Sequence, residues 1–152
     1  MQQVKVRIFQ PSVIQNRLKL IGAKFLGTWE EKDTYFLQPA NCFLKIKRTR
    51  GASFLIKLCR EGQGFGLKKQ VKALKNAEKR EKELSEKFGV VQVLEKRVRS
   101  YQYGDSKVSI HSLPVLGDFL IIEGSFLETK ALLKKLGIEK PEFVSLAFSE
   151  ML

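Results

Sequence analysis

Apolar and polar residues alternate along several stretches of the chain, which is the pattern of a β-strand with one buried face. In residues 3–9, three aliphatic side chains share one parity, while Gln3, Lys5 and Arg7 share the other. The same pattern predicts further strands over residues 23–28, 32–37, 43–49, 53–59, 66–74, 90–103, 107–112 and 118–124. The first two of these segments are expected to pair, and Gly51 is a hairpin signal between the third and the fourth. We therefore expect roughly eight antiparallel strands.

Four segments are expected to form helices: residues 11–21, 75–87, 127–136 and 141–151. Pro11 stands at the start of the first segment and Gly22 directly follows it, and both are typical boundary residues. The second segment carries both charge signs at i,i+4 spacing, which is typical of a solvated helix face. Strands and helices together predict an α+β protein, and 152 residues are enough for a single domain over residues 1–152.

Positive charge is in large excess. The chain has 28 Lys and Arg residues against 16 Asp and Glu residues, a net charge of +12. Because the predicted helix over residues 75–87 mixes both signs, the excess lies on the strands. On an open sheet, the basic parity would simply face water. In a closed barrel it would line a lumen, where like charges repel and lose hydration unless an anion fills the space.

The rest of the composition favours a cytoplasmic protein with no membrane segment. Hydrophobic residues make up 43% of the chain, which excludes a disordered chain. No apolar run approaches the roughly 20 residues that a membrane helix needs, and the N-terminus lacks the apolar region of a secretory signal. Cys42 and Cys59 are expected to be reduced thiols, and without histidines at ligand spacing they form no metal site.

Short segments occur along the chain in an order and spacing that are typical of one family. They are residues 21–25, 33–36, 44–47, 54–57, 97–99, 116–123 and 146–152. In these segments, which span nearly the whole chain, the protein resembles the CYTH domains, or triphosphate tunnel metalloenzymes, which include class IV adenylyl cyclase and thiamine triphosphatase. The resemblance implies a closed eight-stranded antiparallel β-barrel, a tunnel with flanking helices. It also implies basic residues that hold a triphosphate and glutamates that hold a divalent metal.

The chain departs from the family at the acidic positions. Where the family opens with Glu-x-Glu-x-Lys, this chain has Gln3, Lys5 and Arg7. The positions of four further family acids align with Gln70, Lys72, His111 and Ile121. Lys68 stands at the basic position that precedes the first two of these acids in the family. Of the acidic set, Glu123 is retained. Mg²⁺ needs anionic oxygen ligands, so this set implies a barrel without metal or other cofactor, with Mg²⁺ expected only if the chain is catalytically active.

The predicted ligand-binding residues are the basic residues of the strands together with one histidine and one glutamate. They are Lys5, Arg7, Lys45, Lys47, Lys57, Lys68, Lys72, Arg97, Arg99, His111 and Glu123. Tyr35 and Tyr101 are candidates for stacking on a nucleobase. Each prediction has a structural alternative: a solvated sheet face for the lysines, a structural hydrogen bond for His111, an ion pair for Glu123, and core packing for the tyrosines. No nucleophile motif or phosphate loop is present, so no catalytic residue is assigned.

Three hypotheses for the function follow. In the first, the chain sequesters or senses a small phosphate-rich nucleotide, a cyclic or other signalling nucleotide being one case, or a polyphosphate, without metal. In the second, it is an active metal-dependent triphosphatase or class IV adenylyl cyclase. In the third, it binds nucleic acid along its outer surface through its net positive charge. One-site binding of a nucleotide favours the first two, which metal dependence then separates, whereas steep salt dependence with long polyanions favours the third.

Overall fold

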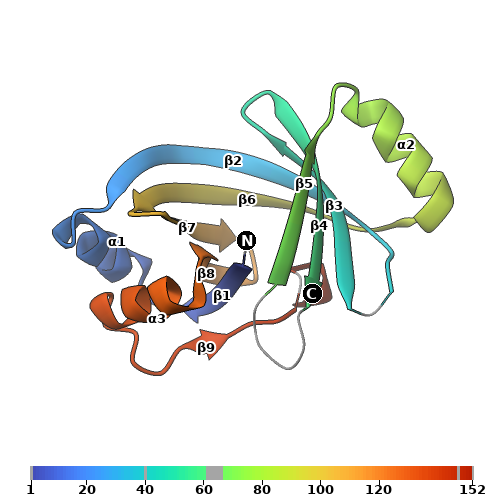
Figure 1. Ribbon diagram of the computed structural model, residues 1–152. Coiled ribbons are helices and arrows are strands. Elements are labelled where there is room, and N and C mark those ends of the chain that lie inside the picture. Colours follow the sequence, from blue (N-terminus) through green and yellow to red (C-terminus); the bar gives the residue numbers. More distant parts are fainter. Residues whose placement is uncertain (1, 40, 61–66, 147, 152) are drawn as a thin grey trace.

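The structure is a computed structural model that describes residues 2–39, 41–60, 67–146 and 148–151 (Figure 1). The elements in chain order are β1 (Gln2–Ile8), α1 (Pro11–Leu20), β2 (Lys24–Phe36), β3 (Cys42–Thr49), β4 (Ala52–Arg60), β5 (Leu67–Ala73), α2 (Ala77–Phe88), β6 (Val90–Tyr103), β7 (Ser106–Leu113), β8 (Gly117–Gly124), α3 (Phe126–Lys135), β9 (Glu142–Phe143) and the 3-10 turn η1 (Phe148–Met151).

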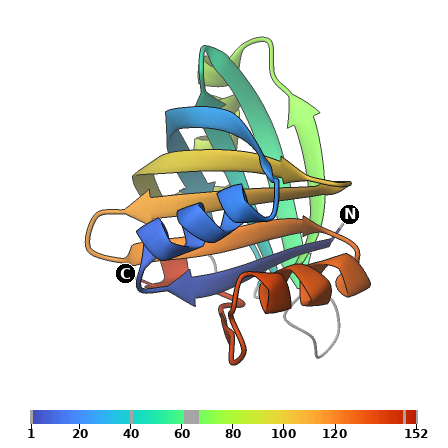
Figure 2. The ribbon, with the colours of Figure 1, turned by 90° about the vertical axis from the view of Figure 1, so that its left-hand side faces the viewer.

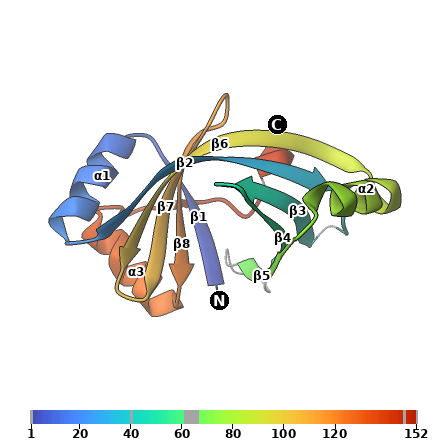
Figure 3. The same ribbon diagram turned by 90° about the horizontal axis from the view of Figure 1, so that it is seen from above.

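The strands form one antiparallel sheet in the order β5-β4-β3-β2-β6-β7-β8-β1, and the short β9 pairs with the outer edge of β1. Pairing of β1 with β5, through Gln2 with Lys68 and Gln3 with Leu67, closes the sheet. The long strands β2 and β6 run side by side from the α1 side of the molecule to the α2 side (Figure 3). This confirms the predicted closed eight-stranded antiparallel barrel with flanking helices.

The helices cover the outside of the barrel, and their cores decide which face of each strand turns inward. α1 and α3 lie across one half (Figure 2), where Val4, Val6 and Ile8 of β1 pack with residues such as Leu18 and Leu132 of the two helices. On the other half, Leu84 of α2 packs against apolar residues of β2 and β3. Because the aliphatic face of β1 lies outside, its polar face turns into the barrel.

Two predicted elements are wrong. Residues 23–28 and 32–37 do not form a strand pair, because β2 is one continuous strand that pairs with β6 along its length. Residues 141–151 do not form a helix. They contain β9, which pairs with β1, and the turn η1, while Ala147 lies outside the described residues. The backbone amide of Val144 donates to the carbonyl of Lys5, so the segment bonds to the barrel and not to itself.

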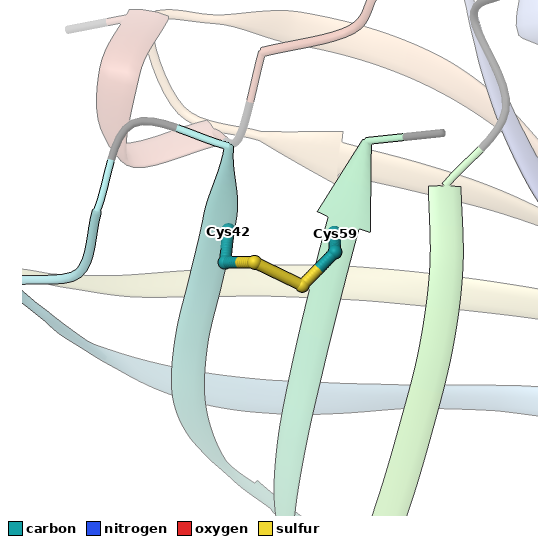
Figure 4. Close-up of a disulfide and its surroundings, with 2 residues drawn as sticks. All are labelled: Cys42 and Cys59. Carbon is teal, nitrogen blue, oxygen red and sulfur yellow. A yellow bond between two sulfur atoms is a disulfide. The ribbon is translucent and has the colours of Figure 1, made fainter. Parts of the chain in front are cut away.

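The cysteines form a disulfide, which corrects the prediction of two reduced thiols. Cys42 and Cys59 are directly paired residues of β3 and β4, with their Cα atoms 4.1 Å apart (Figure 4). The bond therefore joins the open ends of the β3–β4 hairpin. No helix in the described part of the chain is long and apolar enough to cross a membrane.

Candidate ligand-binding site in the barrel

The interior of the barrel is lined mainly by polar and charged side chains. Six lysines face it, and they come from five strands: Lys5, Lys45, Lys47, Lys69, Lys96 and Lys107. Three carboxylates lie among them, Glu31 and Asp33 of β2 and Glu123 of β8. The space left between these side chains is about 40 Å³. The interior is thus a filled cluster of charges in which ammonium groups outnumber carboxylates.

Asp33 is the most buried of the three acids, with 1% of its surface exposed. Its Oδ2 atom lies 2.8 Å from the Nζ atom of Lys45 and 2.9 Å from that of Lys96. Burial by itself would raise the pKa of this carboxyl, but the two ammonium groups outweigh burial and hold the pKa well below its usual range. Asp33 is therefore ionised at neutral pH and acts as the counter-ion of both lysines.

The two carboxylate oxygens of Glu31 have different surroundings. Its Oε2 atom accepts a hydrogen bond from Trp29 Nε1 at 2.8 Å and lies 3.4 Å from Lys47 Nζ. Its Oε1 atom lies 3.8 Å from Lys96 Nζ and has no hydrogen-bond partner. Burial opposes ionisation, but the coulombic attraction of Lys96 and Lys47 lowers the pKa of Glu31. One oxygen of a buried carboxylate is thus left without a donor.

The third acid belongs to a separate group of charges. Glu123 Oε1 lies 2.7 Å from Lys69 Nζ, and Lys107 is the direct cross-strand neighbour of Glu123. Burial opposes ionisation of Glu123, but Lys69 and Lys107 lower its pKa.

Burial and the neighbouring lysines also lower the pKa of Lys47 to about 8, although Glu31 opposes this shift. The ammonium groups therefore crowd one another even with the carboxylates present.

The C-terminal turn reaches into the same cluster. Phe148 is 2% exposed, and its ring centroid lies 3.9 Å from Lys5 Nζ and 5.3 Å from Lys96 Nζ. Lys5 Nζ also donates a hydrogen bond to the carbonyl of Leu146 at 2.6 Å. Two of the six interior lysines thus contact the C-terminal segment as well as the barrel.

His111 lies in the interior and is neutral. Burial, followed by the charges of Lys96, Lys45, Lys47 and Lys5, lowers its pKa well below 6.5. Its Nδ1 atom has no hydrogen-bond partner. A general base needs a partner group that positions it, and within the described residues the Nδ1 atom of His111 has none.

The lowered pKa of His111 predicts a pH-dependent stability. In the unfolded chain His111 takes up a proton near pH 6.5, whereas in the folded chain it stays neutral at that pH. The contribution of His111 to stability is therefore present above pH 6.5 and is lost as the pH falls. We expect the free energy of unfolding to decrease by about 1 kcal/mol between pH 7 and pH 5.5. Urea titrations of the natural chain and of His111→Gln test this, because the variant should lack that decrease. Equal decreases in both proteins would contradict the assignment.

The structure brings part of the predicted set together. The residues that line the interior as expected are Lys5, Lys45, Lys47, His111, Glu123 and Tyr35. The residues that do not are Arg7, Lys57, Lys68, Lys72, Arg97, Arg99 and Tyr101. In β5 and β6 the inner parity holds Lys69 and Lys96, so the predicted positions on these two strands were out of register by one residue. A shift of one residue moves a side chain to the opposite face.

The other predicted residues lie outside the barrel interior. Lys57, Lys68 and Lys72 are exposed on the outer face of β4 and β5. On β6, Arg97 is 68% exposed beside Glu30 and Arg99 lies over the Phe25 ring. Arg7 donates to the carbonyl of Leu116 and lies 3.6 Å from Glu142, while Tyr101 belongs to the core beneath α1 and α3. The residues that the sequence analysis missed are Glu31, Asp33, Lys69, Lys96 and Lys107.

A larger hollow, here called the outer groove, lies beside the barrel interior. Its volume is about 820 Å³, and it is lined by residues 30–32, 48–53, 95–97 and 112–114. These residues come from the middles of β2 and β6, the β3–β4 hairpin turn and the end of β7. Glu31 and Lys96 line both the outer groove and the interior, so the two spaces meet at this pair.

Comparison with known proteins supports the fold assignment. No family model and no curated protein matches the chain. Among solved structures, the PH1012 protein of Pyrococcus horikoshii is 23% identical over 100% of this chain and 99% of its own, with a TM-score of 0.86. A conserved hypothetical protein of Pyrococcus furiosus is 17% identical over the full length of both chains, with a TM-score of 0.85. A candidate adenylate cyclase of Vibrio parahaemolyticus is 13% identical over 99% of this chain and 96% of its own, with a TM-score of 0.76. The chain therefore shares the fold of these proteins, a closed antiparallel barrel with flanking helices.

The resemblance to triphosphate tunnel metalloenzymes implies a divalent metal, but the charged residues of this barrel fit one poorly. Two lysines hold Asp33, while Glu31 lies beside Lys47 and Lys96 and Glu123 beside Lys69. Over the described ranges, no three His, Cys, Asp or Glu side chains are grouped so that they could bind one ion. Mg²⁺ would have to displace ammonium groups from each carboxylate.

Proposed function

We propose that this chain binds a phosphate-rich nucleotide or polyphosphate in the barrel without a divalent metal, as a sequestering or sensing protein. The observation that carries the proposal is the excess of interior lysines over carboxylates in a closed barrel. Phosphate oxygens accept charge-assisted hydrogen bonds from ammonium groups, and each such bond contributes roughly 1.5–3 kcal/mol. An anion with several phosphate groups would supply the negative charge that the cluster lacks.

Binding of such a ligand requires side chains in the barrel interior to move. A space of about 40 Å³ holds a few water molecules but no triphosphate. Lysine side chains can rotate toward a ligand, and Phe148 contributes an aromatic ring to the same space. The outer groove meets the interior at Glu31 and Lys96, so a phosphate group that enters from the groove passes Lys96 and competes with its contact to the Phe148 ring.

Binding without metal is the direct test. In the presence of EDTA, calorimetry with tripolyphosphate should show saturable one-site binding. A ligand concentration of about 100 times Kd should stabilise the fold by about 2.7 kcal/mol and raise the Tm by about 5–10 °C. If EDTA abolishes the binding, or if neither tripolyphosphate nor any nucleotide shifts the Tm, the proposal is wrong. Turnover of ATP with Mg²⁺ would favour the enzyme hypothesis instead.

Nucleic-acid binding is the second candidate function. The exposed residues Lys57, Lys68 and Lys72 share the outer face of β4 and β5, where they form a basic surface outside the barrel. Binding there would depend steeply on salt and would require long polyanions. Substituting these three lysines by alanine separates the candidates, because the change should abolish nucleic-acid binding and spare tripolyphosphate binding.

A further inference from the structure

Lys47 is held less firmly than the other interior lysines that pair with an acid. Its Nζ atom lies 3.4 Å from Glu31 Oε2, and the same oxygen accepts the hydrogen bond from Trp29. Within the described residues, the other three such lysines lie 2.7, 2.8 and 2.9 Å from their nearest carboxylate oxygen. The side chain of Lys47 is also more exposed than theirs, at 18%. A small molecule can therefore reach its amine.

Ammonium groups of three strands surround Lys47. Lys45 lies on the same face of β3, Lys69 comes from β5 and Lys96 from β6. Burial and these three charges lower the pKa of Lys47 to about 8 from the usual 10.5, against the opposing effect of Glu31. At pH 8 about half of the Lys47 side chains are therefore neutral amines, whereas an ordinary lysine is neutral to less than about 1%. A lysine in such surroundings is an activated nucleophile.

The interior around Lys47 lacks negative charge and has little free space. Among the described residues, six lysines and three carboxylates leave an excess of three positive charges. The free space of about 40 Å³ holds a few water molecules. It therefore also accommodates CO2, a neutral molecule of three non-hydrogen atoms that forms an anion when it reacts with an amine.

We propose that Lys47 is a modification site for CO2, which adds reversibly to its Nζ atom and forms a carbamate. The neutral amine attacks the carbon of CO2, an N–C bond forms, and the electron pair of one C–O π bond moves to oxygen. The ammonium group loses one proton to solvent before the attack, and the nitrogen loses a second proton after it. The reaction therefore needs no oxidant, reductant or further reactant.

The carbamate would improve the balance of charge in the barrel. Conversion of Lys47 from a cation to an anion reduces the excess of positive charge from three to one. The new carboxylate can accept charge-assisted hydrogen bonds from the neighbouring ammonium groups. Glu31 loses one cationic neighbour but keeps Lys96 and the hydrogen bond from Trp29. The inference goes beyond nucleotide binding and does not depend on it, because it requires only the amine and CO2.

The probe is ¹³C-labelled bicarbonate at about pH 8. Carbon NMR detects carbamates directly, and triethyloxonium ion traps them as stable esters whose position peptide mapping then identifies. The label on Lys47 should exceed that on any other lysine by about tenfold or more, because Lys47 has a larger neutral fraction. The α-amino group of the chain has a usual pKa of about 7.7–8.0, so it also forms a carbamate and is the internal positive control.

Two variants complete the design. Lys47→Arg keeps the positive charge but removes the amine, so the carbamate signal of Lys47 should disappear while that of the α-amino group remains. Lys57→Arg makes the same change at an exposed residue on the outer face of β4, and both signals should remain. Trapping in the natural chain locates the label even if Lys47→Arg does not fold.

Two results would overturn the inference: label on Lys47 no greater than on other lysines, or a second signal that persists in Lys47→Arg. Bicarbonate that binds only as an ion leaves no trapped label, which would also overturn it. Binding of tripolyphosphate in CO2-free buffer is measured separately. Such binding without label on Lys47 would contradict this inference alone, whereas label on Lys47 without binding of tripolyphosphate or any nucleotide would contradict only the proposed function.

Discussion

Replacing Asp33 by asparagine is expected to lower the free energy of unfolding by about 3–5 kcal/mol. The carboxylate of Asp33 is the shared counter-ion of Lys45 and Lys96, and all three side chains are buried. An asparagine of the same size leaves two ammonium groups without a negative charge between them. Urea denaturation followed by circular dichroism measures the loss. Asp105→Asn, at an exposed position in the β6–β7 turn, is the matched control and should change stability by less than about 0.5 kcal/mol.

The same variant also tests the ligand. If an anion takes the place of the missing charge, tripolyphosphate should stabilise Asp33→Asn more than it stabilises the natural chain at equal concentrations. The difference in the free energy of unfolding with and without tripolyphosphate is the readout for both proteins. A variant that is as stable as the natural chain would show that the two lysines do not depend on Asp33. Equal stabilisation of the two proteins would show that the anion binds elsewhere.

Substitution of Lys5 by alanine should weaken tripolyphosphate binding about tenfold to a hundredfold. Lys5 is 4% exposed, lines the interior and stands where the triphosphate tunnel metalloenzymes that the chain resembles have an acid. A glutamate there would repel a phosphate unless a metal lay between them, whereas an ammonium group can donate to a phosphate oxygen directly. Calorimetry in EDTA gives the affinities of the variant and of the natural chain.

Lys57→Ala is the control for this change. It removes the same charge from an exposed residue on the outer face of β4, so the affinity for tripolyphosphate should change less than about threefold. Equal losses in the two variants would indicate a general effect of net charge. An unchanged affinity in Lys5→Ala would show that the cation at position 5 has not taken over the role of a metal.

Alternation in the sequence was enough to predict which side chains share a face of a strand. It does not determine which of the two faces points into the barrel. In β1 the aliphatic residue Val6 lies outside, beneath the helices, and Lys5 lies inside. In β4 the arrangement is reversed, because Ile56 and Leu58 line the interior and Lys57 is exposed. The packing of helices against each strand decides between the two, and this packing is a property of the whole fold.

The missed residues have a similar explanation. Arg97 resembles a family position, yet it lies outside, because the inner parity of β6 holds Lys96 and Val98. Asp33 is the counter-ion of Lys45 from β3 and Lys96 from β6. This role could therefore be predicted only if the order of the strands in the sheet were known. A pattern within one strand carries no information about these partners.

The disulfide, in contrast, could have been predicted. Thr49 and Ala52 pair at the turn of the β3–β4 hairpin, and Cys42 and Cys59 each stand seven residues beyond that pair. A hairpin centred on Gly51 would pair Cys42 with Arg60, one residue from the observed register, so the prediction already brought the two cysteines close together. The expectation of reduced thiols rested on the compartment and not on this register.

The pairing of β2 with β6 has a consequence for the kinetics of folding. Hairpins such as β3–β4 and β6–β7 join residues that are close in the sequence, but β2 joins β6 across the whole segment from β3 to α2. Contacts of long sequence separation form late, because the intervening chain must first lose entropy. Asp33 and Lys96 meet only when this step is complete. A ligand of the lysine cluster has no binding site in a folding transition state that precedes the pairing of β2 with β6. Such a ligand would therefore slow unfolding while leaving the rate of folding nearly unchanged.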